Sequence, residues 1–299
     1  MPNLFKPDIK REITKEKTLP DSSDGKECVN TKKESEEPIT EKEYSDIEKW
    51  DEMDLLPEVL RGIYAYGYET PSPIQKKAIQ PMRDGRDLIA QAQSGTGKTA
   101  TFAIGALMTV DTTVRNLQII CVSPTRELTM QISTVFKGLS EFMRDISIET
   151  FVGGCPVNDN IQTIKKNKPH IVIGTPGRVF DLIRRRALYV NGVKQFILDE
   201  ADELLSNGFD EQIKSIFKSL PESVQTCIFS ATLPQHVFHV TDAFMRNPVQ
   251  IIVKAEQLTL EGISQYYVAT ANDVQKYDTL IDLYSSFSVS HCIIYTMRY

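Results

Sequence analysis

The sequence has 299 residues, a formal net charge of −6, 41% hydrophobic residues and 25% charged residues. These values are those of an ordinary globular protein, and they exclude collagen-like chains and small disulfide-rich scaffolds. At roughly 150 residues per domain, the length suggests about two domains. The negative net charge argues weakly against a nucleic-acid partner, although a local basic stripe can coexist with a negative net charge.

The cysteines and histidines predict neither disulfides nor a metal site. The five cysteines lie far apart, without CxxC spacing and mostly within apolar runs. We expect them to be small buried side chains in a reducing compartment. The close histidine pair, His236 and His239, falls on the pattern of an amphipathic helix. No apolar run has the length of a signal peptide or a membrane span, which favours a cytoplasmic or nuclear protein.

Residues 1–45 are rich in Lys, Glu, Asp, Ser and Thr and show no helical or strand period. Such a segment cannot bury enough apolar surface to offset the entropy lost on ordering. We therefore predict a disordered, charged N-terminal arm. A solvated tail is favoured over a role in localisation or partner binding.

Residues 46–250 alternate apolar runs with helix-period stretches. The expected strands are 87–91, 117–122, 148–152, 170–174, 195–198, 226–230 and 249–253, and the expected helices are 98–108, 125–143, 177–186 and 210–220. Nearly continuous apolar strands separated by helices are typical of a parallel sheet covered on both faces. We therefore predict an α/β fold whose ligands bind beyond the carboxyl ends of the strands.

A linker is predicted at 251–262, and residues 263–299 have the pattern of the start of a second α/β unit. The pattern predicts strands at 264–270 and 291–295 and a helix at 275–287. Fewer than about fifty residues are too few to complete such a unit. We expect this second unit to be incomplete.

The segment AQSGTGKT at 92–99 follows a predicted strand and precedes a predicted helix. This is the context of a P-loop, in which Gly95 and Gly97 let backbone amides approach phosphate oxygens. Lys98 is expected to reach the β- and γ-phosphates, and the Thr99 hydroxyl to bind Mg²⁺. Ala92 stands where the general pattern has its first glycine. A purely structural glycine turn is the disfavoured alternative.

A predicted strand also runs into Asp199-Glu200-Ala201-Asp202. A carboxylate at a strand end can hold the metal ion of a P-loop enzyme, so we assign Asp199 to Mg²⁺, through water. Glu200 is placed to orient or deprotonate the attacking water. Acidic residues at a helix start are commonly solvated, but their position after a P-loop favours the functional interpretation.

Further motifs follow the same order as a known family. They are GYETPSPIQ at 67–75, PTREL at 124–128, the glycine pair at 153–154, TPGR at 175–178 and SAT at 230–232. Together with the P-loop and residues 199–202, they resemble the DEAD-box family of ATP-dependent RNA helicases. Residues 50–75 and LTLEGI at 258–263 look most like the eukaryotic initiation-factor-four-A type. The resemblance implies a RecA-like domain at 46–250 and the truncated start of a second at 263–299.

The resemblance also implies a site for ATP. Gln75 is expected to recognise the adenine edge and Tyr68 to stack on the base, while Trp50 is either a further adenine contact or a packing anchor. The phosphate-binding residues are Gln93, Ser94, Gly95, Thr96, Gly97, Lys98 and Thr99. Ser230 and Thr232 are expected to couple hydrolysis to strand separation through the acidic motif.

The expected RNA contacts are Pro124, Thr125, Arg126, Gly154, Thr175, Pro176, Gly177 and Arg178. Hydroxyls, helix N-termini and guanidinium groups contact phosphates without reading bases, so RNA binding should be sequence-independent and salt-sensitive. The threonines could instead be ordinary helix caps, and Arg126 a structural ion-pair partner. The basic run 184–186 is better explained as a solvated helix end.

The first hypothesis is therefore an ATP- and Mg²⁺-dependent RNA helicase that is a monomer and works with translation or RNA-processing factors. The alternative is a non-catalytic module that binds ATP and RNA, because the arginine segment expected in a second domain does not appear. A P-loop kinase for small molecules is disfavoured, since PTREL, TPGR and SAT would then have no purpose.

Overall fold

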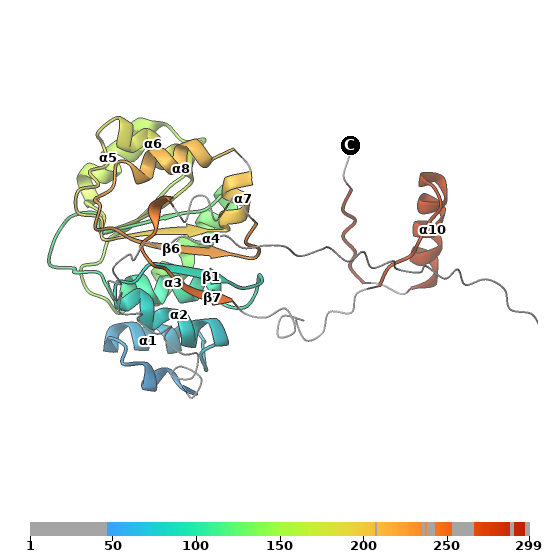
Figure 1. Ribbon diagram of the computed structural model, residues 1–299, viewed down its shortest axis with the longest axis horizontal. Coiled ribbons are helices and arrows are strands. Elements are labelled where there is room, and N and C mark those ends of the chain that lie inside the picture. The colour runs from blue at the N-terminus through green and yellow to red at the C-terminus, as the bar shows by residue number, and fades with distance from the viewer. Residues whose placement is uncertain are drawn as a thin grey trace, which may run out of the picture. The chain divides into compact units, whose positions relative to one another are not determined.

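The structure is a computed structural model that describes residues 47–206, 208–234, 237, 243–252, 266–287 and 290–296. The predicted arm at 1–45, most of the linker predicted at 251–262 and the histidines of the close pair lie outside the described residues. The described helices and strands alternate along the chain as the sequence pattern predicts (Figure 1).

Seven parallel strands form a sheet in the order β3-β4-β2-β5-β6-β1-β7. Their bounds are β1 Leu88–Gln91, β2 Ile119–Val122, β3 Ile148–Phe151, β4 Ile171–Gly174, β5 Gln195–Asp199, β6 Gln225–Ser230 and β7 Val249–Ile252. Each lies within or next to a predicted apolar run, so the predicted parallel sheet is confirmed. Because β7 ends at Ile252, the sheet includes the first residues of the predicted linker.

The helices cover both faces of the sheet. They are the 3₁₀ helix η1 Trp50–Met53 and the α-helices α1 Pro57–Ala65, α2 Pro73–Arg83, α3 Lys98–Leu107, α4 Arg126–Leu139, α5 Val157–Asn167, α6 Pro176–Arg184, α7 Ala201–Ser206 and α8 Asp210–Phe217. The predictions for α3, α4, α6 and α8 are confirmed. The helices η1, α1, α2, α5 and α7 were not predicted, and of these α5 buries no residue fully.

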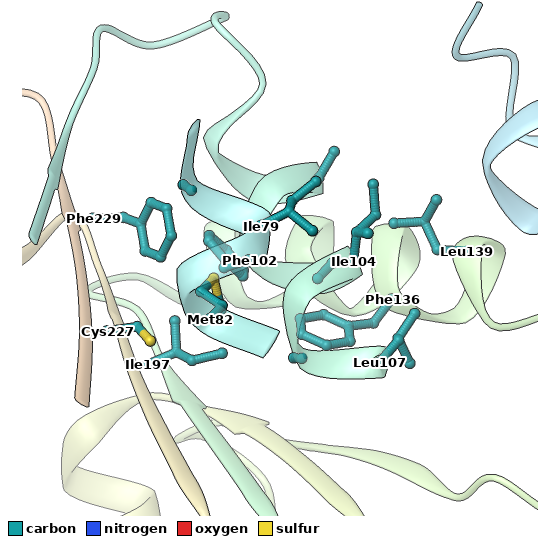
Figure 2. Packing of buried hydrophobic residues seen from close by; sticks show 14 of the residues in the cluster. Ile79, Met82, Phe102, Ile104, Leu107, Phe136, Leu139, Ile197, Cys227 and Phe229 are labelled. Carbon is teal, nitrogen blue, oxygen red and sulfur yellow. The ribbon is translucent and has the colours of Figure 1, made fainter. Parts of the chain in front are cut away.

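Alternate residues of the same strands face different cores. On β2, Ile119 and Cys121 pack with α1 to α4, whereas Ile120 and Val122 pack with α6 to α8. Phe102 of α3 lies at the centre of the first core (Figure 2), with its ring centroid 5.1 Å from that of Phe229. This period of two, with both faces buried, explains why the strands read as continuous apolar runs.

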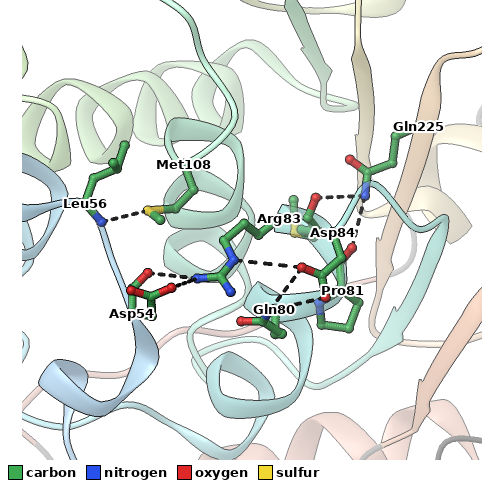
Figure 3. A network of polar contacts seen from close by, with 9 residues as sticks. Asp54, Leu56, Gln80, Pro81, Arg83, Asp84, Met108 and Gln225 are labelled. Atoms are coloured by element: carbon green, nitrogen blue, oxygen red, sulfur yellow. Dashed lines mark hydrogen bonds and ion pairs between the residues drawn. The ribbon is translucent and has the colours of Figure 1, made fainter.

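A polar network holds the C-terminal end of α2 to its surroundings (Figure 3). The Arg83 guanidinium donates to the Asp54 carboxylate over 3.0 Å, and the Gln225 amide nitrogen donates to the backbone oxygens of Met82 (3.0 Å) and Arg86 (2.6 Å). The Gln225 side chain is buried, so these bonds satisfy a polar group that would otherwise be costly to bury. The bonds from Gln225 hold α2 against β6. The first turn of α2 contacts the predicted P-loop at 92–99, which is called the phosphate loop below.

The C-terminal part of the chain forms α10, Asp273–Ser286, as predicted. The strands predicted at 264–270 and 291–295 are wrong: the described residues 266–270 and 291–296 form no strand. A strand needs a neighbour to accept and donate its ladder bonds, and an apolar, β-branched run without one keeps no regular structure.

The two described cysteines of the sheet, Cys121 and Cys227, are buried as predicted. Cys155 and Cys292 are exposed, so the prediction of burial is wrong for them. None of the helices in the described ranges is long and apolar enough to cross a membrane.

Candidate functional site

The strand order divides the carboxyl edge of the sheet into two halves. The strands β5, β6 and β1 are neighbours, and they lead into the acidic motif, the SAT motif and the phosphate loop. The strands β3, β4 and β2 are neighbours on the other side, and they lead into the glycine pair, TPGR and PTREL. Segments that are far apart in sequence therefore meet as two adjoining groups.

The phosphate loop between β1 and α3 adopts a conformation that its glycines permit. Gly95 and Gly97 have φ of 83° and 97°, in the left-handed region that disfavours a side chain. A Cβ on Gly97 would also lie 2.7 Å from the Gln75 amide nitrogen. Gly97 precedes the first turn of α3, so free backbone N–H groups and the positive helix end face this loop.

Lys98 and Glu200 form an ion pair across the site. The Lys98 Nζ lies 2.9 Å from Glu200 Oε1, with 5% and 21% of the two side chains exposed. Glu200 has φ of 50°, an arrangement that costs a residue with a side chain about 1–2 kcal/mol. This strained turn lies directly after β5, at the point where the chain enters α7.

Asp199, the last residue of β5, is 4% exposed and sits beside this pair. Burial raises its pKa to about 7, with a further contribution from the negative Glu200 and an opposing one from Lys98. Its Oδ1 is buried and has no hydrogen-bond partner among the described residues. Such an atom is an acceptor that lacks a donor.

The acidic motif is joined to the SAT motif by hydrogen bonds. The Thr232 hydroxyl donates to Asp202 Oδ2 over 2.5 Å, and the Asp202 backbone N–H donates to the Ser230 hydroxyl over 3.2 Å. Burial opposes ionisation of Asp202, but hydrogen bonds from Thr232 and Ser230 outweigh it and lower its pKa. These contacts link the ends of β5 and β6.

The GYETPSPIQ segment packs against the phosphate loop. The Gln75 side chain is buried; its oxygen accepts from the Ser72 backbone N–H over 2.7 Å, and its nitrogen donates to the Gly97 carbonyl over 3.4 Å. Tyr68 is partly buried and stacks at a tilt on Tyr66. Trp50 is fully buried in the core, which supports its interpretation as a packing anchor.

The second half of the edge forms a groove with a volume of about 640 Å³. Its lining includes Pro124, Thr125, Arg126, Gly153, Thr175, Gly177 and Arg178. The helices α4 and α6 begin here, with Thr125 and Thr175 at their N-caps. Two helix N-termini, two arginines and two threonine hydroxyls therefore converge on one groove.

The arginines of the groove are positioned by their neighbours. Arg178 donates to the Asn160 side-chain oxygen and, over 2.7 Å, to the Cys155 carbonyl. Arg126 lies against the glycine pair, where a Cβ on Gly154 would come within 2.6 Å of its guanidinium. Gly154 has φ of 95°, so both its backbone and its lack of a side chain are required here.

Some of the predicted RNA contacts and basic residues have ordinary structural roles. The Thr125 hydroxyl accepts from the Leu128 N–H over 3.2 Å, so it caps α4 while its proton stays available. Arg184 and Arg185 pair with Asp181 of their own helix, each over 2.8 Å, as expected of a solvated helix end. Arg126 has no ion pair among the described residues, contrary to the structural alternative.

The structure adds residues that the sequence did not single out. Asp202 was part of the acidic motif, but no role was assigned to it, because its partners on β6 depend on the strand order. Asn160 fixes Arg178 from a helix that no motif marks. Glu127, Val157 and Phe209 also line the groove. No cluster of three His, Cys, Asp or Glu side chains in the described ranges could hold a metal ion by itself.

A family model described as DEAD/DEAH box helicase matches residues 72–240, more than half of the chain. A protein of Pyricularia oryzae named ATP-dependent RNA helicase eIF4A is 51% identical over 249 residues, which cover 83% of this chain and 62% of the relative. A protein of the same name from Emericella nidulans is 50% identical over 256 residues, covering 85% and 64%. The chain thus spans less than two thirds of these relatives.

Solved structures of DEAD-box proteins are similar to this chain. A DEAD box protein from the hyperthermophile Methanococcus jannaschii has a TM-score of 0.67 at 32% identity, covering 79% of this chain and 63% of that one. Dbp5 of S. cerevisiae, bound to RNA and ADP BeF3, has a TM-score of 0.70 at 33% identity, covering 79% and 60%. The predicted RecA-like fold and the resemblance to the eIF4A type are confirmed.

Proposed function

Because the chain belongs to the DEAD/DEAH box helicase family, we propose that it binds ATP at the phosphate loop and RNA in the adjoining groove, and that it couples ATP hydrolysis to RNA unwinding. The observation that carries this proposal is the 2.9 Å pair between Lys98 and Glu200 beside the buried Asp199. It joins a phosphate-binding cation to a carboxylate that can act on water, next to a carboxylate that can hold a metal.

The residues at the end of β5 fit a hydrated magnesium ion. Asp199 Oδ1 lacks a donor, and the protons of a metal-bound water would supply one. Thr99, in the first turn of α3, adds a hydroxyl. Asp199 and Thr99 would hold the ion, which would supply positive charge to offset the negative charge that develops during phosphoryl transfer. Mg²⁺ usually keeps several waters, which suits a site without three protein carboxylates.

In the proposed reaction, Lys98 first binds the phosphates and Glu200 then acts on the attacking water. The Lys98 ammonium has three N–H donors, of which Glu200 accepts one, so the others can reach phosphate oxygens. Once phosphates draw Lys98 toward them, the Glu200 carboxylate can accept a proton from a water. The oxygen of that water attacks the γ-phosphorus and the bond to ADP breaks. Gln75 lies beside the loop, where it would recognise adenine, and Tyr68 would stack on the base.

The groove fits the backbone of a single strand. Phosphates can be bound by the N-termini of α4 and α6 and by Arg126 and Arg178. None of these groups distinguishes one base from another. The bonds from Asp202 to Ser230 and Thr232 give a path by which a change at the acidic motif reaches the end of β6.

The likeness to proteins named eIF4A supports protein partners among translation or RNA-processing factors. We also propose that the protein is a monomer of the cytoplasm, with the nucleus as the alternative location.

The test is Glu200→Gln, with Glu222→Gln as an exposed control on another face of the chain. The amide keeps the shape of the side chain but cannot accept the proton from water. We expect the variant to bind ATP and RNA and to lose hydrolysis by at least about a hundredfold, as for removal of a general base. Full turnover in Glu200→Gln would remove Glu200 from the proposed role.

A further inference from the structure

A second cavity lies at the opposite edge of the sheet from the groove. It has a volume of about 420 Å³, and its lining includes Leu117 and Pro169, which lie two residues before the starts of β2 and β4. The helices α5 and α6 begin at the groove and end at this cavity, which Ile164 and Arg186 help to line. The nucleotide site and the groove do not use it.

The cavity has a basic rim and an apolar floor. Arg115, Lys165, Lys168 and Arg186 line it, and none of the lining residues that the structure describes is a carboxylate. The floor is formed by apolar residues, which include Leu117, Ile164 and Leu188. Tyr189, 75% exposed, stands at the edge. A concentration of positive charge of this kind is unexpected in a chain with a net charge of −6.

The cations of the rim are mostly free. Arg115 pairs with Asp145 over 3.2 Å, but both side chains are exposed and the pair is weak. Lys165, Lys168 and Arg186 have no ion pair among the residues that the structure describes. Arg186 thereby differs from Arg184 and Arg185, which Asp181 occupies.

Helix dipoles do not account for the whole arrangement. Cations complement the carboxyl ends of α5 and α6, but Arg115 belongs to the loop before β2. Lys168 and Arg186 also have φ of 44° and 55°, positions after a helix where glycine or asparagine is the usual residue. The chain thus retains strain at two points that present a cation to the cavity.

From the basic rim and apolar floor, we propose that this cavity binds an acidic protein segment that inserts an apolar side chain. The carboxylates of the segment pair with the rim, and its apolar side chain fills the floor. A nucleic-acid backbone brings phosphates but no apolar side chain for the floor, and its phosphates favour helix N-termini, which lie at the groove instead.

The experiment measures the fluorescence anisotropy of a labelled synthetic peptide in which one leucine and one phenylalanine are flanked by glutamates. The titrant is the full 299-residue chain without nucleotide. We expect binding that weakens with salt. Lys165→Glu combined with Arg186→Glu should weaken it at least about tenfold, whereas Lys218→Glu on α8 should not change it. A peptide with serine in place of both apolar residues should bind more weakly.

A second variant distinguishes a loss of peptide binding from a loss of the fold. Tyr189→Ala alters a side chain that is 75% exposed, so the fold should be unaffected and binding should fall severalfold. The proposal is overturned if the peptide does not bind or if the charge reversal leaves its affinity unchanged. It is also overturned if single-stranded RNA displaces the peptide and the charge reversal abolishes that RNA binding, because the cavity is then a nucleic-acid site. ATP binding is unaffected by these outcomes, so the proposed function is tested separately.

Discussion

Lys98 is the residue on which the proposed nucleotide site depends, since it is buried and pairs with a carboxylate 102 residues away in sequence. Replacing it with alanine removes the cation that phosphates would contact. A hydrogen bond to a charged group contributes about 1.5–3 kcal/mol. We therefore expect Lys98→Ala to weaken the binding of a fluorescent ATP analogue by about ten- to a hundredfold.

The control for this prediction is Lys218→Ala, which changes an exposed lysine at the end of α8. Thermal unfolding of both variants shows whether the fold is intact. If Lys98→Ala binds the analogue as tightly as the parent chain, the assignment of the phosphate loop is wrong.

Asp199 makes the stability of the nucleotide-free chain depend on pH. Its pKa is raised by burial to about 7 in the folded chain, whereas an aspartate of an unfolded chain titrates near about 4. The folded chain therefore binds more protons than the unfolded chain between these values. The free energy of unfolding consequently falls as pH rises through this window.

Asp199→Asn removes this effect because an amide does not ionise. At pH 8 we expect the nucleotide-free variant to melt above the parent by at least roughly 2–4 °C, which corresponds to about 1 kcal/mol. At pH 5 the difference should shrink, since the parent is then protonated. Calorimetric scans at the two pH values measure it, and a difference that does not change with pH would contradict the raised pKa.

At the scale of residues, the sequence predicted those that a local motif marks. The sequence singled out Lys98, Asp199 and Glu200 because a glycine pattern or a strand end precedes them. The partners of Asp202 were not, because they lie on β6 and the contact exists only once β5 and β6 are neighbours. Trp50 was ambiguous because an aromatic residue in a segment of mixed polarity suits either burial or stacking.

At the scale of elements, Arg178 joins the start of α6 to α5 and to the loop after β3. We expect Arg178→Ala to weaken binding of single-stranded RNA evenly across sequences and to reduce the salt slope by about one, as for loss of one phosphate contact. Titrations of several oligonucleotides at two or more salt concentrations measure both quantities.

The matched control is Arg144→Ala, an exposed arginine that does not line the groove. It should leave both affinity and salt slope unchanged. Loss of binding for some sequences and not others in Arg178→Ala would show that this arginine reads bases.

The strands of the sheet were predicted because their burial is strong and regular, whereas α1 and α2 were not predicted although each buries several residues. Both faces of the strands are buried, so each strand is a nearly continuous apolar run that can be recognised in the sequence. The helix α5 has no fully buried residue, and its start was hidden in the loop after the glycine pair. The runs at 264–270 and 291–295 have strand composition but lack pairing partners, and composition alone does not supply them.

At the scale of the whole molecule, one sheet carries the two proposed ligand sites on one edge and a basic cavity on the other. The strand order sets this division, with the nucleotide half over β5, β6 and β1 and the groove over β3, β4 and β2. Because β5 and β2 are neighbours, the two halves adjoin. ATP and RNA bound there would lie close enough for each to affect the other.

The proposal that ATP and RNA bind at adjoining sites and affect each other is tested most directly by steady-state ATP hydrolysis. It is measured for the 299-residue chain with and without single-stranded RNA. Lys98→Ala serves as the blank, and single-stranded DNA as the specificity control. The proposed function predicts turnover above the blank that RNA stimulates and DNA does not. ATP binding without RNA-stimulated turnover would contradict it and leave a module that binds its ligands without catalysis.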